Sequence, residues 1–106
     1  MPKNKNEKEQ KTRIRLPDRS KKEMFALAES LMGGSRLKVI CEDDKNRMAR
    51  IPGKLKRKQR IRVDDLLIVK PWEIQDKKAD IIYRYRRTKA ITLSKRNILP
   101  ENIDVF

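Results

Sequence analysis

Apolar and polar residues alternate along two segments of this chain. Between residues 36 and 42, the apolar Leu37, Val39 and Cys41 occupy every second position, and charged residues flank them. Residues 79–85 show the same alternation, with an alanine, an isoleucine and two tyrosines at every second position. A period of two is typical of a strand that buries one face. The pattern predicts a strand at each segment and assigns the two tyrosines to the core and the rim of the sheet.

Turn-forming residues separate further candidate strands. The chain turns at residues 43–46, Asp-Asp-Lys-Asn, and returns as a short strand over 47–51 that Pro52-Gly53 stops. The apolar run 66–69, Leu-Leu-Ile-Val, predicts a strand buried on both faces, and Pro71 ends it.

The first apolar segment, residues 23–32, fits two structures. As a helix it has a capping box, Ser20 with Glu23 three positions later, and Gly33 at its C-terminal end. As a strand it places alternate apolar residues on one face and uses Gly33-Gly34 as a turn. Local propensity favours the helix, whereas the strands that follow favour an antiparallel meander. These signals leave both structures open.

If residues 23–32 form a strand, the chain has five strands, with a basic connection over 54–62 between the third and the fourth. A short helical turn in that connection completes the arrangement of an OB-fold, a five-stranded barrel. Thr88 can cap a final short helix that carries Ile91, Leu93 and Leu99, before Pro100 breaks it. We therefore predict an all-β fold, an OB-fold barrel with one helical connection and a short C-terminal helix.

Three parts of the chain differ in composition. Residues 1–16 are rich in Lys, Asn, Glu and Gln and nearly devoid of apolar side chains, so we expect a flexible, basic N-terminal tail that is disordered in isolation. This tail can order on RNA, and a solvated solubility tail is the alternative. Residues 17–87 form the expected barrel, and residues 88–106 the C-terminal helix and a short tail.

The charge balance indicates a polyanionic partner. The chain has 29 Lys and Arg against 15 Asp and Glu, for a formal net charge of +14. Residues 54–62 contribute six cations and no carboxylate, which is typical of a surface that meets phosphates. No apolar run approaches the roughly 20 residues of a membrane-spanning helix, so we expect a soluble, cytoplasmic protein with no membrane partner. Histidine is absent and cysteine occurs once, so we expect no metal and no cofactor.

Four motifs occur together and in order: Gly-Gly-Ser-Arg-Leu at 33–37, Arg-Ile-Pro-Gly-Lys-Leu at 50–55, the run 65–73 that ends Val-Lys-Pro-Trp-Glu, and Lys-Ala-Asp-Ile-Ile-Tyr-Arg-Tyr at 78–85. They resemble translation initiation factor 1A, particularly its archaeal form. The resemblance implies an OB-fold, and thus a strand at 23–32. It also implies binding to the small ribosomal subunit at the decoding (A) site and help in loading initiator tRNA and mRNA. The implied partners are small-subunit rRNA, initiator tRNA, mRNA and other initiation factors, and the high charge favours a monomer.

The resemblance and the binding face usual for an OB-fold together give a set of RNA-contacting candidates. Cations of this kind contact phosphates, and arginine can also stack on a base. Family members often have a tryptophan near Arg60, which is absent here, so Arg60 is the candidate replacement. For Trp72, covering the edge of the barrel is favoured over stacking on a base. The predicted RNA-contacting residues are Arg36, Arg47, Arg50, Lys54, Lys56, Arg57, Lys58, Arg60, Arg62, Arg84 and Arg86.

Two other classes of protein fit less well. A general single-stranded RNA-binding OB module or RNA chaperone depends on exposed aromatic residues, and this chain has one Trp, two Tyr and two Phe. An enzyme needs a nucleophile with a base partner or a phosphate-binding loop. The sequence has no histidine and no Gly-rich loop of that kind, so we do not expect an enzyme.

Overall fold

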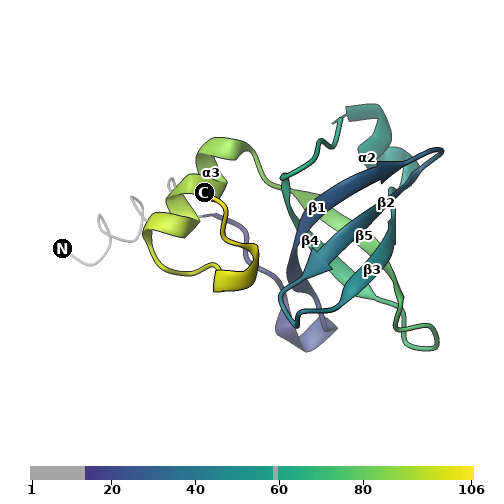
Figure 1. The fold of residues 1–106 in the computed structure, drawn as a ribbon, viewed down its shortest axis with the longest axis horizontal. Coiled ribbons are helices and arrows are strands. Elements are labelled where there is room, and N and C mark those ends of the chain that lie inside the picture. The colour runs from purple at the N-terminus through teal and green to yellow at the C-terminus, as the bar shows by residue number, and fades with distance from the viewer. Residues whose placement is uncertain (1–13, 59) are drawn as a thin grey trace, which may run out of the picture.

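The computed structural model describes residues 14–58 and 60–106. Its strands close into one barrel in the order β1-β2-β3-β5-β4, with all neighbours antiparallel except β3 and β5 (Figure 1). This is the predicted five-stranded OB-fold. Most of the tail predicted to be disordered lies outside the described residues. The strands are β1 (Met24–Met32), β2 (Arg36–Cys41), β3 (Asn46–Arg50), β4 (Leu66–Pro71) and β5 (Lys78–Arg84).

The ambiguous first segment is a strand. β1 pairs with β2 on one side and with β4 on the other, so Ala26 lies opposite both Cys41 and Leu67. This double pairing outweighs the local helix propensity, which is only a weak preference. Ser20 and Glu23, which resemble a capping box in the sequence, do not cap a helix over residues 23–32. Asp18, not Ser20, caps the short 3-10 helix η1 (Arg19–Lys21), and Glu23 accepts a hydrogen bond from the Asp18 backbone N–H.

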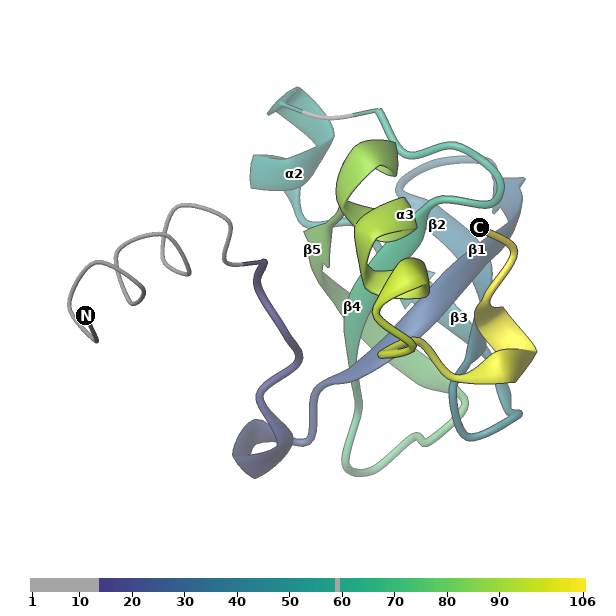
Figure 2. The same ribbon diagram turned by 90° about the vertical axis from the view of Figure 1, so that its left-hand side faces the viewer.

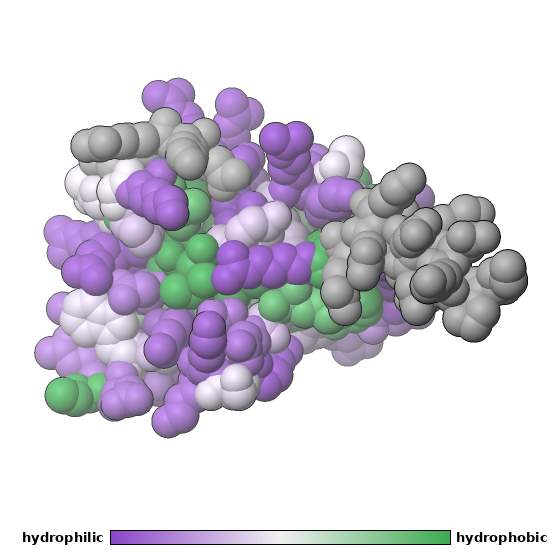
Figure 3. Space-filling model, turned by 180° about the vertical axis from the view of Figure 1, so that it is seen from behind, coloured by the Kyte–Doolittle hydropathy of each residue, from purple (hydrophilic) through white to green (hydrophobic). Residues whose placement is uncertain are grey.

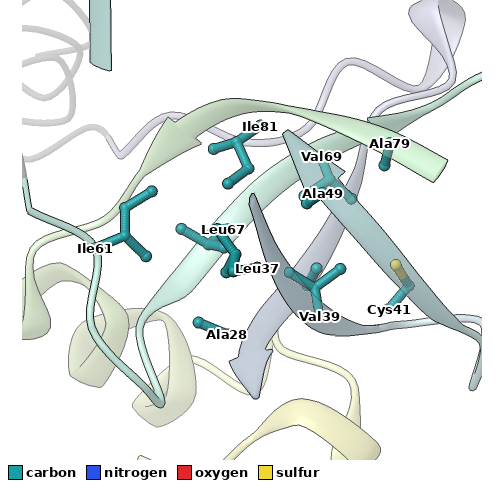
Figure 4. Packing of buried hydrophobic residues seen from close by; sticks show 11 residues of the cluster. Ala28, Leu37, Val39, Cys41, Ala49, Ile61, Leu67, Val69, Ala79 and Ile81 are labelled. Atoms are coloured by element: carbon teal, nitrogen blue, oxygen red, sulfur yellow. The ribbon is translucent and has the colours of Figure 1, made fainter. Parts of the chain in front are cut away.

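The barrel interior is the first of two cores. Small residues, among them Ala28 and Ala79, are fully buried between the strands, and Ile61 from the connection before β4 lies at one end of the cluster (Figure 4). The interior is therefore filled by side chains, as in other small barrels. Its buried members are Ala26, Ala28, Leu37, Val39, Cys41, Ala49, Ile61, Leu67, Val69, Ala79 and Ile81.

The second core lies outside the barrel, over β1 and β4, and we call it the outer core. The helix α3 (Arg87–Lys95), the 3-10 helix η2 (Glu101–Ile103) and the start of the described chain at Ile14 cover this side (Figure 2). The Tyr85 hydroxyl donates a hydrogen bond to the Arg15 backbone carbonyl. This bond holds the segment before η1 against the outer core. The buried members of this core are Ile14, Phe25, Leu27, Leu66, Ile68, Tyr85, Ala90, Leu93, Leu99 and Ile103.

The predicted alternation along β5 fails at one point. Val69 pairs with Ile81 and Ile68 pairs with Tyr83, so one residue of β5, Ile82, is extra at a bulge. Ile81 therefore faces the barrel interior, whereas Tyr83 and the following Tyr85 belong to the outer core. The prediction that all alternate residues of 79–85 share one face is wrong, because the bulge reverses the alternation.

The helices agree in part with the predictions. A short helix, α2 (Gly53–Lys58), follows β3 in the basic connection, as expected. The predicted cap of the C-terminal helix is wrong, because Arg86 is the N-cap of α3 and Thr88 lies inside the helix. Leu99 is buried beyond the end of α3. No helix within residues 14–58 and 60–106 has the length and apolar character needed to cross a membrane.

The outer core makes a testable contribution to stability. Ile103 is fully buried in it, near the C-terminal end of the sequence given. We expect Ile103→Ala to lower the free energy of unfolding by about 2–5 kcal/mol, because it removes buried methyl groups and leaves a cavity. Val105→Ala is the control, because Val105 is 55% exposed, and it should change that value by less than about 0.5 kcal/mol. Urea unfolding measures both. Equal values for the two variants would mean that the C-terminal segment does not unfold together with the barrel.

Candidate nucleic-acid interface

The outer surface of β2, β3, β5 and β4 carries aligned cations. Residues that pair across strands point to the same side of a sheet. Arg36 pairs with Arg50, Arg50 with Asp80, and Asp80 with Lys70, so these residues form one row across four strands. Lys38, Met48 and Lys78 form the adjacent row. We call the residues Arg36, Lys38, Arg50, Lys70 and Lys78 the cationic face.

The strand pattern determines why these residues point outward. Their neighbours Leu37, Ala49 and Ala79 are fully buried in the barrel interior, and alternation sends the next residue to the surface. Lys38, Lys70 and Lys78 are not among the residues predicted from the sequence to contact RNA. The alternation along β2 was enough to find Lys38. The other two needed the pairing of β5 with β3 and β4, which no local pattern reveals.

Two carboxylates partly neutralise the cationic face. Asp80 accepts a hydrogen bond of 3.1 Å from Arg50 Nε, and Glu29 lies 4.0 Å from Lys38 Nζ. The Arg50 side chain is 61% exposed and the Lys38 side chain 43% exposed. Exposed ion pairs of this kind contribute little to stability, so these cations can exchange a carboxylate for a phosphate at low cost. In the view from behind Figure 1, hydrophilic residues surround a central band of hydrophobic residues (Figure 3).

The basic connection meets the cationic face through Arg60. Arg60 and Arg36 line a common hollow of about 270 Å³, together with apolar residues that include Ile51 and Ile61. Lys54, at the start of α2, and Arg62 are both exposed. Lys56, Arg57 and Lys58 belong to α2, and their side chains lie outside the part of the chain that the structure describes. Arg60 thus lies next to the cationic face, at Arg36.

Arg47 has a structural role and does not join the cationic face. It lies three residues before Arg50, which places the two on opposite faces of β3. Its side chain is only 2% exposed and contacts Asp43 and Asp76 at 2.9 and 3.0 Å. Its Nε also donates to the Asp76 backbone carbonyl. Burial opposes a charged guanidinium, but the hydrogen bonds to Asp43 and Asp76 outweigh it and raise the pKa of Arg47.

Arg84 and Arg86 also lie away from this face. Arg84 shares a face with Leu67, whose side chain is inside the barrel, and its Nε donates to Asp65 at 2.9 Å. Asp65 also accepts from the Arg62 backbone N–H, so Arg84 helps to hold the loop before β4. Arg86 is exposed at the N-cap of α3, in the segment that covers the outer core. We therefore leave Arg47, Arg84 and Arg86 out of the interface that we propose.

The fold and this surface define a basic OB-fold domain of the class that binds nucleic acid. A family described as Translation initiation factor 1A / IF-1 matches residues 11–105. The chain is 51% identical over 100 residues to Translation initiation factor 1A of Thermoplasma volcanium, covering 94% of this chain and 81% of that protein. It is 47% identical over 92 residues to Translation initiation factor 1A of Methanococcus maripaludis, covering 86% and 88% of the two chains. The chain belongs to the translation initiation factor 1A family.

A solved structure agrees with the fold. The crystal structure of YjeQ from Thermotoga maritima aligns with a TM-score of 0.52 and 18% sequence identity, covering 61% of this chain and 23% of that one. At this identity the similarity concerns the barrel alone.

Two arginines of β3 should separate stability from RNA binding. Arg47→Met should lower the free energy of unfolding by about 2 kcal/mol, because it removes a buried, charge-assisted hydrogen-bond network. Arg50→Met is the matched control on the same strand. It should change stability by less than about 1 kcal/mol, since its ion pair is exposed, while weakening RNA binding. Urea unfolding and an RNA titration measure the two effects. The assignment fails if Arg50→Met is the more destabilising variant.

The Arg47 network should also respond to acid. Burial would raise the pKa of Asp43, but hydrogen bonds from Arg47 lower it overall. Hydrogen bonds from Arg47 and then Lys45 lower the pKa of Asp76. The resulting stabilisation is complete above the ordinary carboxyl pKa of about 4 and is lost as the pH falls through the lower, folded-state values. The stability difference between the parent and Arg47→Met should therefore be constant above about pH 5 and shrink below about pH 4. A difference that does not depend on pH would contradict this network.

Proposed function

We propose that this chain binds the small ribosomal subunit at the decoding (A) site through rRNA contacts and promotes the loading of initiator tRNA and mRNA. The match to the translation initiation factor 1A family over residues 11–105 supports this role. The observation that carries it is the cationic face, which Arg60 of the basic connection adjoins at Arg36. Lys54 and Arg62 are further exposed cations of the same connection. The role requires binding and positioning, with no covalent chemistry.

The cationic face and the basic connection supply affinity through phosphate contacts. Each phosphate that a cation neutralises releases condensed counterions, so affinity falls steeply with salt. Arg36 and Arg50 have planar guanidinium groups that can bind a phosphate through two hydrogen bonds or stack on a base. Lys38, Lys70 and Lys78 act as point charges.

Rigidity supplies selectivity for a folded RNA. The strands hold Arg36, Arg50 and Lys78 at fixed separations, because they stand on hydrogen-bonded ladders of a closed barrel. Fixed cations match one arrangement of phosphates better than others, so phosphate contacts can set position and orientation. A folded rRNA site presents such an arrangement, whereas an unstructured strand does not. We infer that the partner is rRNA on the small subunit, within a complex that also holds initiator tRNA, mRNA and other initiation factors.

Binding to small subunits tests this proposal. The purified chain is sedimented with archaeal small ribosomal subunits near physiological salt, against an excess of unstructured RNA of equal phosphate content. We expect saturation at one protein per subunit that survives the competitor. A stoichiometry that continues to rise, or binding that is lost to the competitor, would indicate a general RNA-binding protein and contradict the proposed role.

Two triple variants locate the contact within the same assay. Replacing Lys56, Arg57 and Lys58 by alanine should weaken binding and reduce the slope of log affinity against log salt by about 2 to 3, since each lost phosphate contact removes about 0.7–0.9. The control replaces Lys89, Lys95 and Arg96, which are exposed cations on or next to α3. It changes the net charge equally and should leave the slope nearly unchanged. Equal effects from both variants would mean that net charge alone governs binding.

A further inference from the structure

Trp72 lies at the edge of the cationic face with two cations over its ring. It is half-buried, just after β4, and its backbone N–H donates to the Lys78 carbonyl at 2.9 Å. The Arg50 guanidinium carbon lies 5.5 Å from the centre of the indole ring, and Lys78 Nζ lies 5.4 Å from it. Both cations belong to the cationic face. The indole is therefore fixed beside groups that we have assigned to phosphate contact.

A hollow beside the indole has room for a ligand group. It has a volume of about 420 Å³ and is lined by Lys70, Pro71, Trp72, Glu73, Ile74 and Asp80. Its wall includes the apolar Pro71 and Ile74, the latter 97% exposed. Lys70, another cation of the cationic face, stands at the same hollow. Apolar surface next to cations is the combination that a nucleotide needs, one part for the base and the other for its phosphate.

The hollow also offers hydrogen-bond acceptors for a base. Nucleobases carry amino groups next to a flat aromatic surface. The two carboxylates at the hollow, Glu73 and Asp80, accept hydrogen bonds and can take one from a base amino group. Asp80 is also held by Arg50.

We propose that the hollow at Trp72 binds an unpaired RNA base, which stacks on the Trp72–Arg50 pair while Lys70 and Lys78 contact its flanking phosphates. This proposal rests on the proposed function, since it takes RNA as the partner, and it adds a base contact to what is otherwise a phosphate-binding surface. The position of Trp72 after Pro71, at the end of a strand, favoured a role in covering the edge of the barrel. The cations over its ring and the hollow beside it favour a stacking role.

The fluorescence of this residue tests the proposal directly, because the chain has a single tryptophan. A short oligoadenylate RNA is titrated into the intact chain, with inorganic polyphosphate of equal phosphate content as the comparison. We expect quenching that saturates with the RNA and little change with polyphosphate, which has charge but no base. Equal quenching by both, or RNA binding by anisotropy without quenching, would overturn the proposal. The parent chain alone suffices for this test.

Two variants separate stacking from charge. Trp72→Leu should bind oligoadenylate about ten-fold more weakly, the loss expected for one base stack, with an unchanged salt slope because no phosphate contact is removed. Trp72→Phe keeps an aromatic ring and should recover most of the affinity. Urea unfolding shows whether each variant is folded. Unchanged affinity in folded Trp72→Leu, or a loss that comes with a shallower salt slope, would contradict a stacking role.

Ribosomal samples distinguish RNA from protein at this hollow. Trp72 fluorescence should be quenched both by intact small subunits and by their rRNA freed of protein. Quenching by subunits alone would show that a ribosomal protein occupies the hollow, and would overturn the RNA assignment. If Trp72→Leu still saturates at one copy per subunit with parental affinity, this inference fails while the proposed function stands. If the parent does not saturate on subunits but oligoadenylate still quenches it, the proposed function fails and the base site stands.

Discussion

The closure of the barrel by β3 and β5 is the constraint on which the rest of the structure depends. These strands are parallel neighbours, and Met48, Ala49 and Arg50 lie opposite Lys78, Ala79 and Asp80. The Met48 backbone N–H extends the contact with a 2.8 Å hydrogen bond to the Lys77 carbonyl, and Arg47 holds the Asp76 carbonyl next to it. Closure removes exposed strand edges. It also places Lys78 beside Arg50 and brings Trp72 under both, so one pairing builds the barrel and its cationic face.

The two sides of the barrel differ in the residues that they carry and in what covers them. The outer faces of β1 and β4 are apolar at Phe25, Leu66 and Ile68, and α3 with the C-terminal segment covers them. The parts of the outer surface that carry Arg36, Lys38, Arg50, Lys70 and Lys78 lie outside this core. Residues that pair with a carboxylate inside the fold, such as Arg47 and Arg84, contribute to the architecture. Exposed cations that keep only weak ion pairs, such as Arg50 and Lys38, are available to a polyanion.

The sequence was sufficient to predict the barrel and many of the cations of the proposed interface. Strand alternation and the basic run at 54–62 are local patterns that can be recognised without the fold. The sequence was insufficient where a distant contact decides the outcome. Segment 23–32 has the propensity of a helix, and pairing on both sides makes it a strand. The bulge at Ile82 depends on the register with β4, so the sequence pattern wrongly placed Tyr83 and Tyr85 on the face of Ala79 and Ile81, although it correctly predicted that Tyr85 is in the core. Arg47 and Arg50 differ only in the face of β3 on which they lie, and positive charge alone does not distinguish them. Lys78 can be identified as a candidate only from the pairing of β5 with β3.

Tethered cleavage on the ribosome tests the central claim most directly, namely that the cationic face meets rRNA at the decoding site. Cys41 is fully buried, and burial raises the pKa of its thiol, so a second cysteine that reaches solvent can be labelled selectively. A chelated iron at Met48→Cys, a half-buried position that pairs with Lys38 and Lys78 of the cationic face, would generate hydroxyl radicals next to the bound RNA. The same label at Thr88→Cys, on α3, is the control. We expect cleavage of decoding-site rRNA from position 48 and much less from position 88. Equal cleavage from both positions, or cleavage elsewhere on the subunit, would contradict the account.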